Sequence, residues 1–148
     1  MKIEDEIKQS KFKSPHQKAV INLIFTAGWL YTQNQKFFKL FGITSQQFNI
    51  LRILKGQHPK TISATEIKLR MLDKNSDVSR LLDRLAAKGL INKQTCPKDK
   101  RASDVLITQA GLDILSELEK KQKIIDHVQA LSEKEAVELS NLLDKLRG

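Results

Sequence analysis

Basic side chains of two types gather in one part of the sequence. Arg80 and Arg84 lie four residues apart, and Lys98, Lys100 and Arg101 fall within four residues of one another. Guanidinium groups pair with guanine edges and with phosphates, while ammonium groups pair with phosphates. These residue types therefore predict non-covalent binding of a polyanion rather than a chemical reaction.

The side chains that most often carry catalysis are scattered. His16, His58 and His127 lie in different segments, and nothing places them with Cys96 or with a carboxylate pair at the spacing of metal ligands. The sequence contains no glycine pattern of a nucleotide-binding loop and no convincing Ser-His-Asp order. Cys96 is more simply explained as an incidental small residue than as a redox handle. We therefore expect no enzyme, no metal and no cofactor.

The charge of the chain agrees with a polyanionic partner. Among 148 residues, 26 are Lys or Arg and 17 are Asp or Glu, which gives a net charge of +9. Residues 1–104 hold 20 basic and 9 acidic side chains, whereas residues 105–148 hold 6 and 8. A balance this basic predicts binding to nucleic acid or to an anionic membrane surface. Residues 105–148, in which acidic side chains outnumber basic ones, are predicted to have a different function from the rest of the chain.

Length and hydropathy also bear on whether the protein is a membrane protein or a secreted protein. The chain suits one domain of ordinary size, and no apolar run approaches the ~18 residues that span a bilayer. The polar start MKIEDEIKQSKFK lacks the apolar stretch of a secretory signal, and a single cysteine cannot form an internal disulfide. We expect a cytoplasmic protein with no membrane partner.

Cap residues and apolar periodicity predict six helices and one hairpin. Ser14-Pro15 opens a first helix that runs to Phe41, and three capping boxes open others: Thr44 with Gln47, Ser63 with Glu66, and Ser132 with Glu135. Strand-tolerant segments on either side of a polar turn, Cys96 to Arg101, predict a two-stranded β-hairpin between residues 90 and 107. The expected fold is mainly α with a small hairpin.

The helix predicted over residues 75–88 has the shape that a major groove accepts. One face carries an apolar stripe, Val78, Leu81, Leu82 and Leu85, and the opposite face carries Ser76, Arg80, Asp83 and Ala87 between Ser79 and Arg84. Short side chains allow close approach to DNA, and arginine pairs with guanine or phosphate. An ordinary amphipathic helix and a solvated charged turn are the alternatives, and the pairing of helix and basic hairpin favours DNA.

Several short motifs in this region follow a known order. They are VSRLLDRLAAKGLI at 78–91, PKDKRASDVLIT at 97–108, Gly111, and LSEKEAVELSNLLDKL near the end of the chain. Over residues 40–118, the first three of these motifs together resemble the MarR family of winged-helix transcriptional regulators, and the fourth, at residues 131–146, resembles the last helix of that family. The family pattern has Asp-Arg-Leu and Lys-Gly-Leu in the recognition helix, followed by Asp-x-Arg in the wing and Leu-x-Thr at the end of its last strand.

The resemblance implies a fold and a function. It implies a winged helix-turn-helix protein over residues 1–148, with a DNA-binding lobe at 44–108 and dimerisation helices at 14–41 and 109–148. Such proteins bind pseudo-palindromic operators in double-stranded DNA as homodimers. They usually act as repressors, and a small phenolic or aromatic ligand, or an oxidant, relieves the repression.

Residue roles carry over by position. Ser76, Ser79 and Arg80 would face bases, Arg101 would lie at the wing tip with Asp99 as its local partner, and Asp83 could pair with a wing arginine. The full set expected to contact DNA is Lys74, Asn75, Ser76, Ser79, Arg80, Arg84, Lys98, Asp99, Lys100 and Arg101. The sequence departs from the family pattern in three places, of which one is a slightly long and polar segment after Lys55. Lys93 follows Asn92 where an arginine is common, which puts one phosphate contact in doubt, and Cys96 lies in the wing rather than near the N-terminus.

The first and last helices carry more large apolar residues than one lobe can cover. The expected dimer interface includes Val20, Ile24, Leu139, Leu142, Leu143 and Leu146. Packing of both helices within one chain is the alternative. Trp29 and Tyr31 are weak candidates for contact with a ligand, because in the family the first helix lines the ligand pocket. Packing in the core or interface is the more ordinary role for them.

Two other functions compete with that of a specific regulator. A non-specific or architectural DNA-binding protein would need the same positive charge, and its affinity for random DNA would equal that for any selected site. A winged-helix module that binds proteins would not need the basic wing, so charge reversal there would leave it functional.

Overall fold

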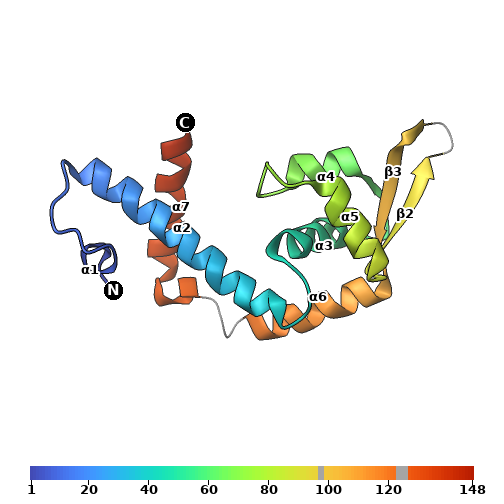
Figure 1. The fold of residues 1–148 in the computed structure, drawn as a ribbon, viewed down its shortest axis with the longest axis horizontal. Helices are drawn as coiled ribbons and strands as arrows, with labels where there is room; N and C mark the ends of the chain where they lie inside the picture. The colour runs from blue at the N-terminus through green and yellow to red at the C-terminus, as the bar shows by residue number, and fades with distance from the viewer. Residues whose placement is uncertain (97–98, 123–126) are drawn as a thin grey trace. The chain divides into compact units, whose positions relative to one another are not determined.

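A computed structural model describes residues 1–96, 99–122 and 127–148 (Figure 1). The chain forms two compact units, residues 1–112 and 113–148. Its elements are α1 (Ile3–Glu6), α2 (Pro15–Lys39), α3 (Ser45–Gln57), β1 (Ile62–Ser63), α4 (Ala64–Arg70), α5 (Val78–Ala87), β2 (Ile91–Cys96), β3 (Asp99–Ile107), α6 (Gln109–Gln122), the 3-10 helix η1 (His127–Ala130) and α7 (Glu133–Arg147). No described helix has the length and apolar character needed to cross a membrane.

The six predicted helices are confirmed as α2 to α7, and local capping explains where they begin. The Ser14 hydroxyl accepts a hydrogen bond from the Gln17 amide, with Pro15 in the first turn of α2. Both bonds of the capping box at the start of α3 are present, as are both at the start of α7. The sequence did not indicate the short helices α1 and η1.

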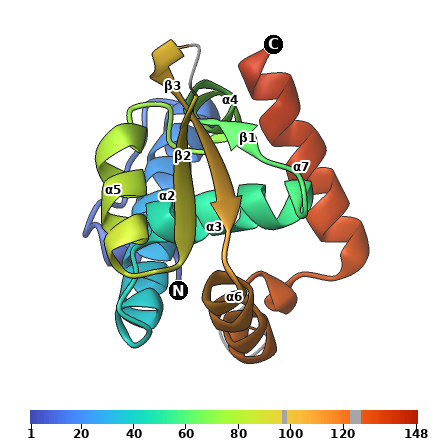
Figure 2. The ribbon, with the colours of Figure 1, turned by 90° about the vertical axis from the view of Figure 1, so that its right-hand side faces the viewer.

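The sheet has three strands rather than the predicted two. Its order is β1-β3-β2, all antiparallel, with Ile62 opposite Val105 and Ile91 opposite Ile107 (Figure 2). The two residues of β1 are too few to show an alternating pattern, so sequence periodicity could not reveal this strand. β3 also begins at Asp99, so part of the segment predicted as a turn belongs to the strand.

The core of the lobe formed by residues 44–108 lies between its helices and the sheet. Helices α3 and α4 pack against α5 and β3, and α5 packs against β2. The buried apolar side chains at these contacts include Ile50, Leu51, Leu54, Ile67, Leu82, Leu85 and Val105. Burial of each such side chain stabilises the fold by about 1.5–3 kcal/mol, so these contacts hold α5 on the other helices and the sheet.

Helix α5 is shorter than the predicted range 75–88. The Asp77 carboxylate accepts a hydrogen bond from the Arg80 amide and forms the N-cap, so the helix begins at Val78. The Ser76 amide donates to the Asp73 carbonyl in the preceding turn. The helix therefore starts one turn later than the polar cluster in the sequence indicated.

The end of the hairpin is tied to the end of α5. The Thr108 hydroxyl donates to the Gly89 carbonyl (2.7 Å) and accepts from the Gly111 amide (3.1 Å). A Cβ at Gly111 would meet the Leu90 carbonyl oxygen at 2.3 Å. Glycine is therefore required for this close approach, which sets the position of the strands relative to α5.

Candidate nucleic-acid interface

Helix α5 presents the polar face that the sequence predicted. Val78, Leu82 and Leu85 are buried and Leu81 is half-buried, which confirms the apolar stripe. On the other side, Ser79, Arg80, Asp83 and Arg84 are all exposed. The helix thus combines a buried stripe, which fixes it on the lobe, with a free face of short and cationic side chains.

The turn before α5 is held by hydrogen bonds to neighbouring elements. The Leu72 amide donates to the Asn49 side-chain oxygen on α3 (2.9 Å), and the Asn75 amide donates to the Asp73 carboxylate (3.0 Å). The Lys74 ammonium donates to the Leu69 carbonyl (2.6 Å). Lys74 and Asn75 are exposed, so the turn offers both side chains to solvent at the start of α5.

Ser76 differs from its predicted neighbours. The residue is half-buried, and its hydroxyl is buried with no hydrogen-bond partner in the described part of the chain. In this arrangement the hydroxyl is buried within the protein. Its position before the helix, outside the exposed face of α5, is the reason.

Asp83 pairs with Lys93 rather than with an arginine in the described structure. The Lys93 ammonium on β2 lies 2.5 Å from a carboxylate oxygen of Asp83 on α5. Strand alternation places Lys93 on the same side as Ile91, which is buried. Sequence reasoning missed this partner because the two residues lie ten positions apart in different elements, and alternation along a strand gives a face but not a partner.

The wing carries the other predicted cations. Asp99, Lys100 and Arg101 form the start of β3, at the end of the hairpin away from Ile107 (Figure 1). Lys98 lies outside the described residues, and the described structure does not cover the side chains of residues 96–103. The strands of this two-stranded wing are paired from Ile91 onward, and the wing lies beside α5.

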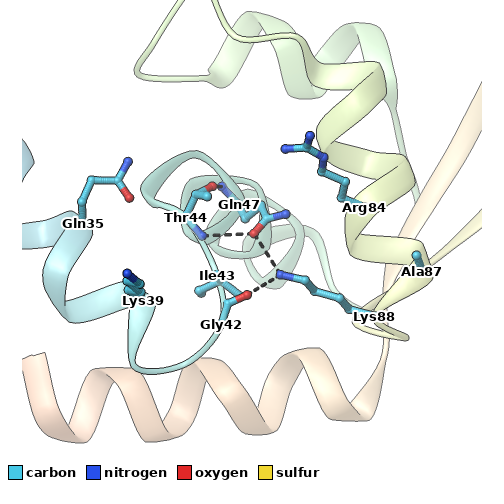
Figure 3. A pocket seen from close by; sticks show the side chains of 9 residues that line it. All are labelled: Gln35, Lys39, Gly42, Ile43, Thr44, Gln47, Arg84, Ala87 and Lys88. Atoms are coloured by element: carbon cyan, nitrogen blue, oxygen red, sulfur yellow. Dashed lines mark hydrogen bonds between the residues drawn. The ribbon is translucent and has the colours of Figure 1, made fainter.

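A cationic pocket lies between α2, the start of α3 and the second half of α5 (Figure 3). Its volume is about 680 Å³, and its lining consists of Gln35, Lys39, Gly42, Ile43, Thr44, Gln47, Arg84, Ala87 and Lys88. Three of these side chains are cationic and none is acidic. Figure 3 shows Arg84 and Lys88 entering from α5, opposite Gln35 and Lys39 on α2. Sequence reasoning assigned Arg84 to DNA and overlooked the pocket.

The two aromatic residues proposed for ligand contact lie on α2 but do not line this pocket. Trp29 is half-buried and borders a smaller cavity of about 170 Å³ together with Met1, Ile3 and Phe25. The Tyr31 hydroxyl accepts a hydrogen bond from the Gln35 amide group (2.7 Å). Tyr31 thus touches a pocket residue, while Trp29 packs beside the N-terminal helix α1.

Metal binding has no support in the described part of the chain. No group of three or more His, Cys, Asp or Glu side chains that could hold a metal ion occurs among the described residues. The chemistry available at α5, its preceding turn and the pocket is hydrogen bonding and charge pairing with anions.

Comparisons with known proteins agree with this geometry. Residues 43–103 match the model of the MarR family. The chain is 28% identical over 113 residues to the HTH-type transcriptional regulator MgrA of Staphylococcus aureus, covering 76% of each. It is 31% identical to a MarR transcription factor of Planctomyces limnophilus, with a TM-score of 0.70 over 93% of this chain and 98% of that one.

A further solved structure shows the same fold with DNA present. A mutant of MarR from E. coli, complexed with operator DNA, has a TM-score of 0.68 and 22% identity, and the match covers 99% of both chains. The likeness extends beyond the lobe to nearly the whole length of each protein.

Proposed function

This chain belongs to the MarR family of DNA-binding transcriptional regulators, and on that premise we propose that it is a homodimeric repressor of a two-fold symmetric operator. The observation that carries the proposal is the exposed face of α5. Ser79 and Arg80 lie there in the first turn, where a recognition helix meets base edges. Arg80 would pair with guanine, and the short Ser79 side chain would permit close approach.

The remaining DNA contacts would position the helix rather than read bases. Lys74 and Asn75 precede α5 and would contact phosphates beside the major groove. Lys98, Lys100 and Arg101 would follow the adjacent backbone or reach into the minor groove, with Asp99 orienting Arg101. The ion pair between Asp83 and Lys93 would hold the wing against α5 so that both elements engage the DNA together.

Exposed apolar rows on two helices support a homodimer. On α2, Val20, Ile24 and Tyr31 are exposed, and Phe37 and Phe38 at its end are the residues it buries. Helix α7 buries none of its fifteen residues, and it exposes Leu139, Leu142 and Leu146. A second copy of the chain would cover such rows. Two recognition helices would then enter successive major grooves about 34–36 Å apart.

The cationic pocket supports relief of repression by a small acidic ligand. An aromatic carboxylate or phenolate would find three cations, from Lys39, Arg84 and Lys88, and apolar contacts from Ile43 and Ala87. Because α5 forms one wall, a ligand there would move the recognition helix. A shift of a few ångströms would remove both half-sites from register at once.

Selection of bound DNA from a random pool, followed by a salt titration on the winning site, tests the proposal. We expect a two-fold symmetric site bound at least about a thousandfold more tightly than random DNA, and a steep loss of affinity with salt. Equal binding to all sequences would instead identify an architectural protein. No binding at modest salt would indicate either a form held inactive by a bound ligand or a protein-interaction module.

A further inference from the structure

Lys88 makes contacts that DNA binding does not require. It forms the C-cap of α5, and its ammonium donates to the Gly42 carbonyl and to the side-chain oxygen of Gln47 at 3.5 Å. Gly42 lies in the connection between α2 and α3, 46 residues earlier in the chain. One side chain thus links the end of the recognition helix to a separate part of the lobe (Figure 3).

Both acceptors of Lys88 are held firmly in place. Gln47 is 2% exposed, and its side-chain oxygen also accepts from the Thr44 amide (3.0 Å) in the capping box of α3. Gly42 has a φ of 67°, a backbone conformation that favours glycine, and the next residue, Ile43, is buried. An ammonium bound to two such fixed oxygens loses its freedom to follow α5 in another orientation.

The electrostatics of this end of α5 also favour the contact. A cation near the last turn of a helix is stabilised by the partial negative charge of the terminal carbonyls. The acceptors of Lys88 are neutral oxygens, and the pocket lining contains no carboxylate to draw its ammonium away. The arrangement therefore holds α5 without adding a charge pair to the DNA-binding face.

We propose that Lys88 is the positioning residue of the recognition helix: it ties the end of α5 to Gly42 and Gln47 and so sets operator specificity without touching DNA. The inference rests on the proposed function for its readout in DNA binding. Non-specific binding depends on total charge, whereas specific binding also needs the orientation of α5. Loss of the Lys88 contacts therefore lowers the affinity for random DNA slightly and the affinity for the operator strongly.

The test compares Lys88→Met with Lys36→Met, which removes the same charge from an exposed lysine of α2 outside the pocket. A charge-assisted hydrogen bond corresponds to about tenfold in an equilibrium constant. We expect Lys88→Met to lower the ratio of operator affinity to random-DNA affinity by about that factor. Lys36→Met should leave the ratio unchanged, and Lys88→Arg should restore part of it. An unchanged ratio in Lys88→Met, or an equal loss in both methionine variants, overturns the proposal.

Hydrogen exchange supplies a second readout that needs no DNA. In Lys88→Met the amides of the last turn of α5 and of residues 42–47 should exchange faster, while Lys36→Met should leave both segments unchanged. Gln47→Glu should slow exchange at the same amides, because a carboxylate binds the ammonium more strongly and also suits the capping box. If neither variant alters exchange there, Lys88 does not position α5, whatever the DNA measurements show. A wild-type protein without an operator preference would contradict the proposed function alone.

Discussion

Helices α5 and α7 are both amphipathic and both begin at a side-chain cap, yet they differ completely in burial. Helix α5 has ten residues and buries Val78, Leu82 and Leu85. Helix α7 has fifteen residues and buries none. An apolar stripe therefore has two uses in this protein. In α5 it fixes the helix on the core of its lobe, and in α7 it stays exposed, as the proposed homodimer requires.

The largest effect is expected where the stripe is buried. Leu82→Ala should lower the free energy of unfolding by about 2–5 kcal/mol, because it removes a fully buried side chain and leaves a cavity. Urea denaturation measures the loss. Leu69→Ala on α4 is the matched control, since Leu69 is 64% exposed and exposed sites usually change stability by less than about 0.5 kcal/mol. Similar losses in both variants would contradict the core described for the lobe.

The stripe of α7 should instead govern self-association. The double variant Leu142→Glu with Leu146→Glu should weaken dimer formation by at least about a hundredfold, because two unpaired carboxylates would be buried in the interface. Both side chains are exposed, so each chain should keep its helical content. Sedimentation equilibrium measures the association. Asn141→Glu, on the same helix but off the apolar row, serves as control. A dimer unaffected by the double variant would place the interface elsewhere.

A smaller effect is expected on the exposed face of α5. Arg80→Ala should weaken operator binding by about 1–3 kcal/mol and relax the preference at one base pair in each half-site. Fluorescence anisotropy on the selected site and on single-base variants measures both changes. Arg147→Ala removes the same charge from α7 and should leave the base preference intact. If the two arginine variants behave alike, Arg80 acts through charge alone.

The smallest effect concerns the cap of α7. Hydrogen bonds from the Ser132 hydroxyl and backbone amide hold the pKa of Glu135 below its ordinary value. A lowered pKa in the folded state stabilises the helix above the unfolded pKa, about 4.3, and this stabilisation is lost as the pH falls through the folded pKa. Amide exchange in the first turn of α7 should therefore rise, after correction for intrinsic rates, as the pH falls below 4. Glu135→Gln should remove that dependence, and an identical pH response in both proteins would exclude this cap as its source.

Much of the fold was predictable because its signals are local. Ser14-Pro15, Thr44 with Gln47, and Ser132 with Glu135 mark helix starts within a few residues, and the structure has all three. The stripe of α5 repeats with the helical period, so its buried side was also foreseen. The wing followed from strand-tolerant segments around a polar turn. The predicted start of α5 was wrong because several polar residues before Val78 are all suitable caps, and Asp77 takes that role.

The candidate site was less predictable than the fold. Arg80 and Ser79 could be assigned to the exposed face from spacing alone. Burial of the Ser76 hydroxyl could not be predicted from the sequence, because it depends on how the turn that starts at Asp73 folds back before α5. The pocket escaped notice because its cations come from α2 and α5, which no short-range pattern connects.

The amino-acid sequence by itself determined where α2, α3 and α7 begin, which stripe of α5 turns inward, and that a basic helix and wing follow one another, since each depends on hydrogen bonds or side-chain periods within a few residues. Tertiary structure alone decided that Ile62 and Ser63 pair with β3, that Lys93 binds Asp83, and that Lys88 reaches Gly42 across 46 residues. These contacts form only when segments far apart in the chain are brought together by burial of the shared core, and no local pattern encodes which of many similar polar groups will then meet.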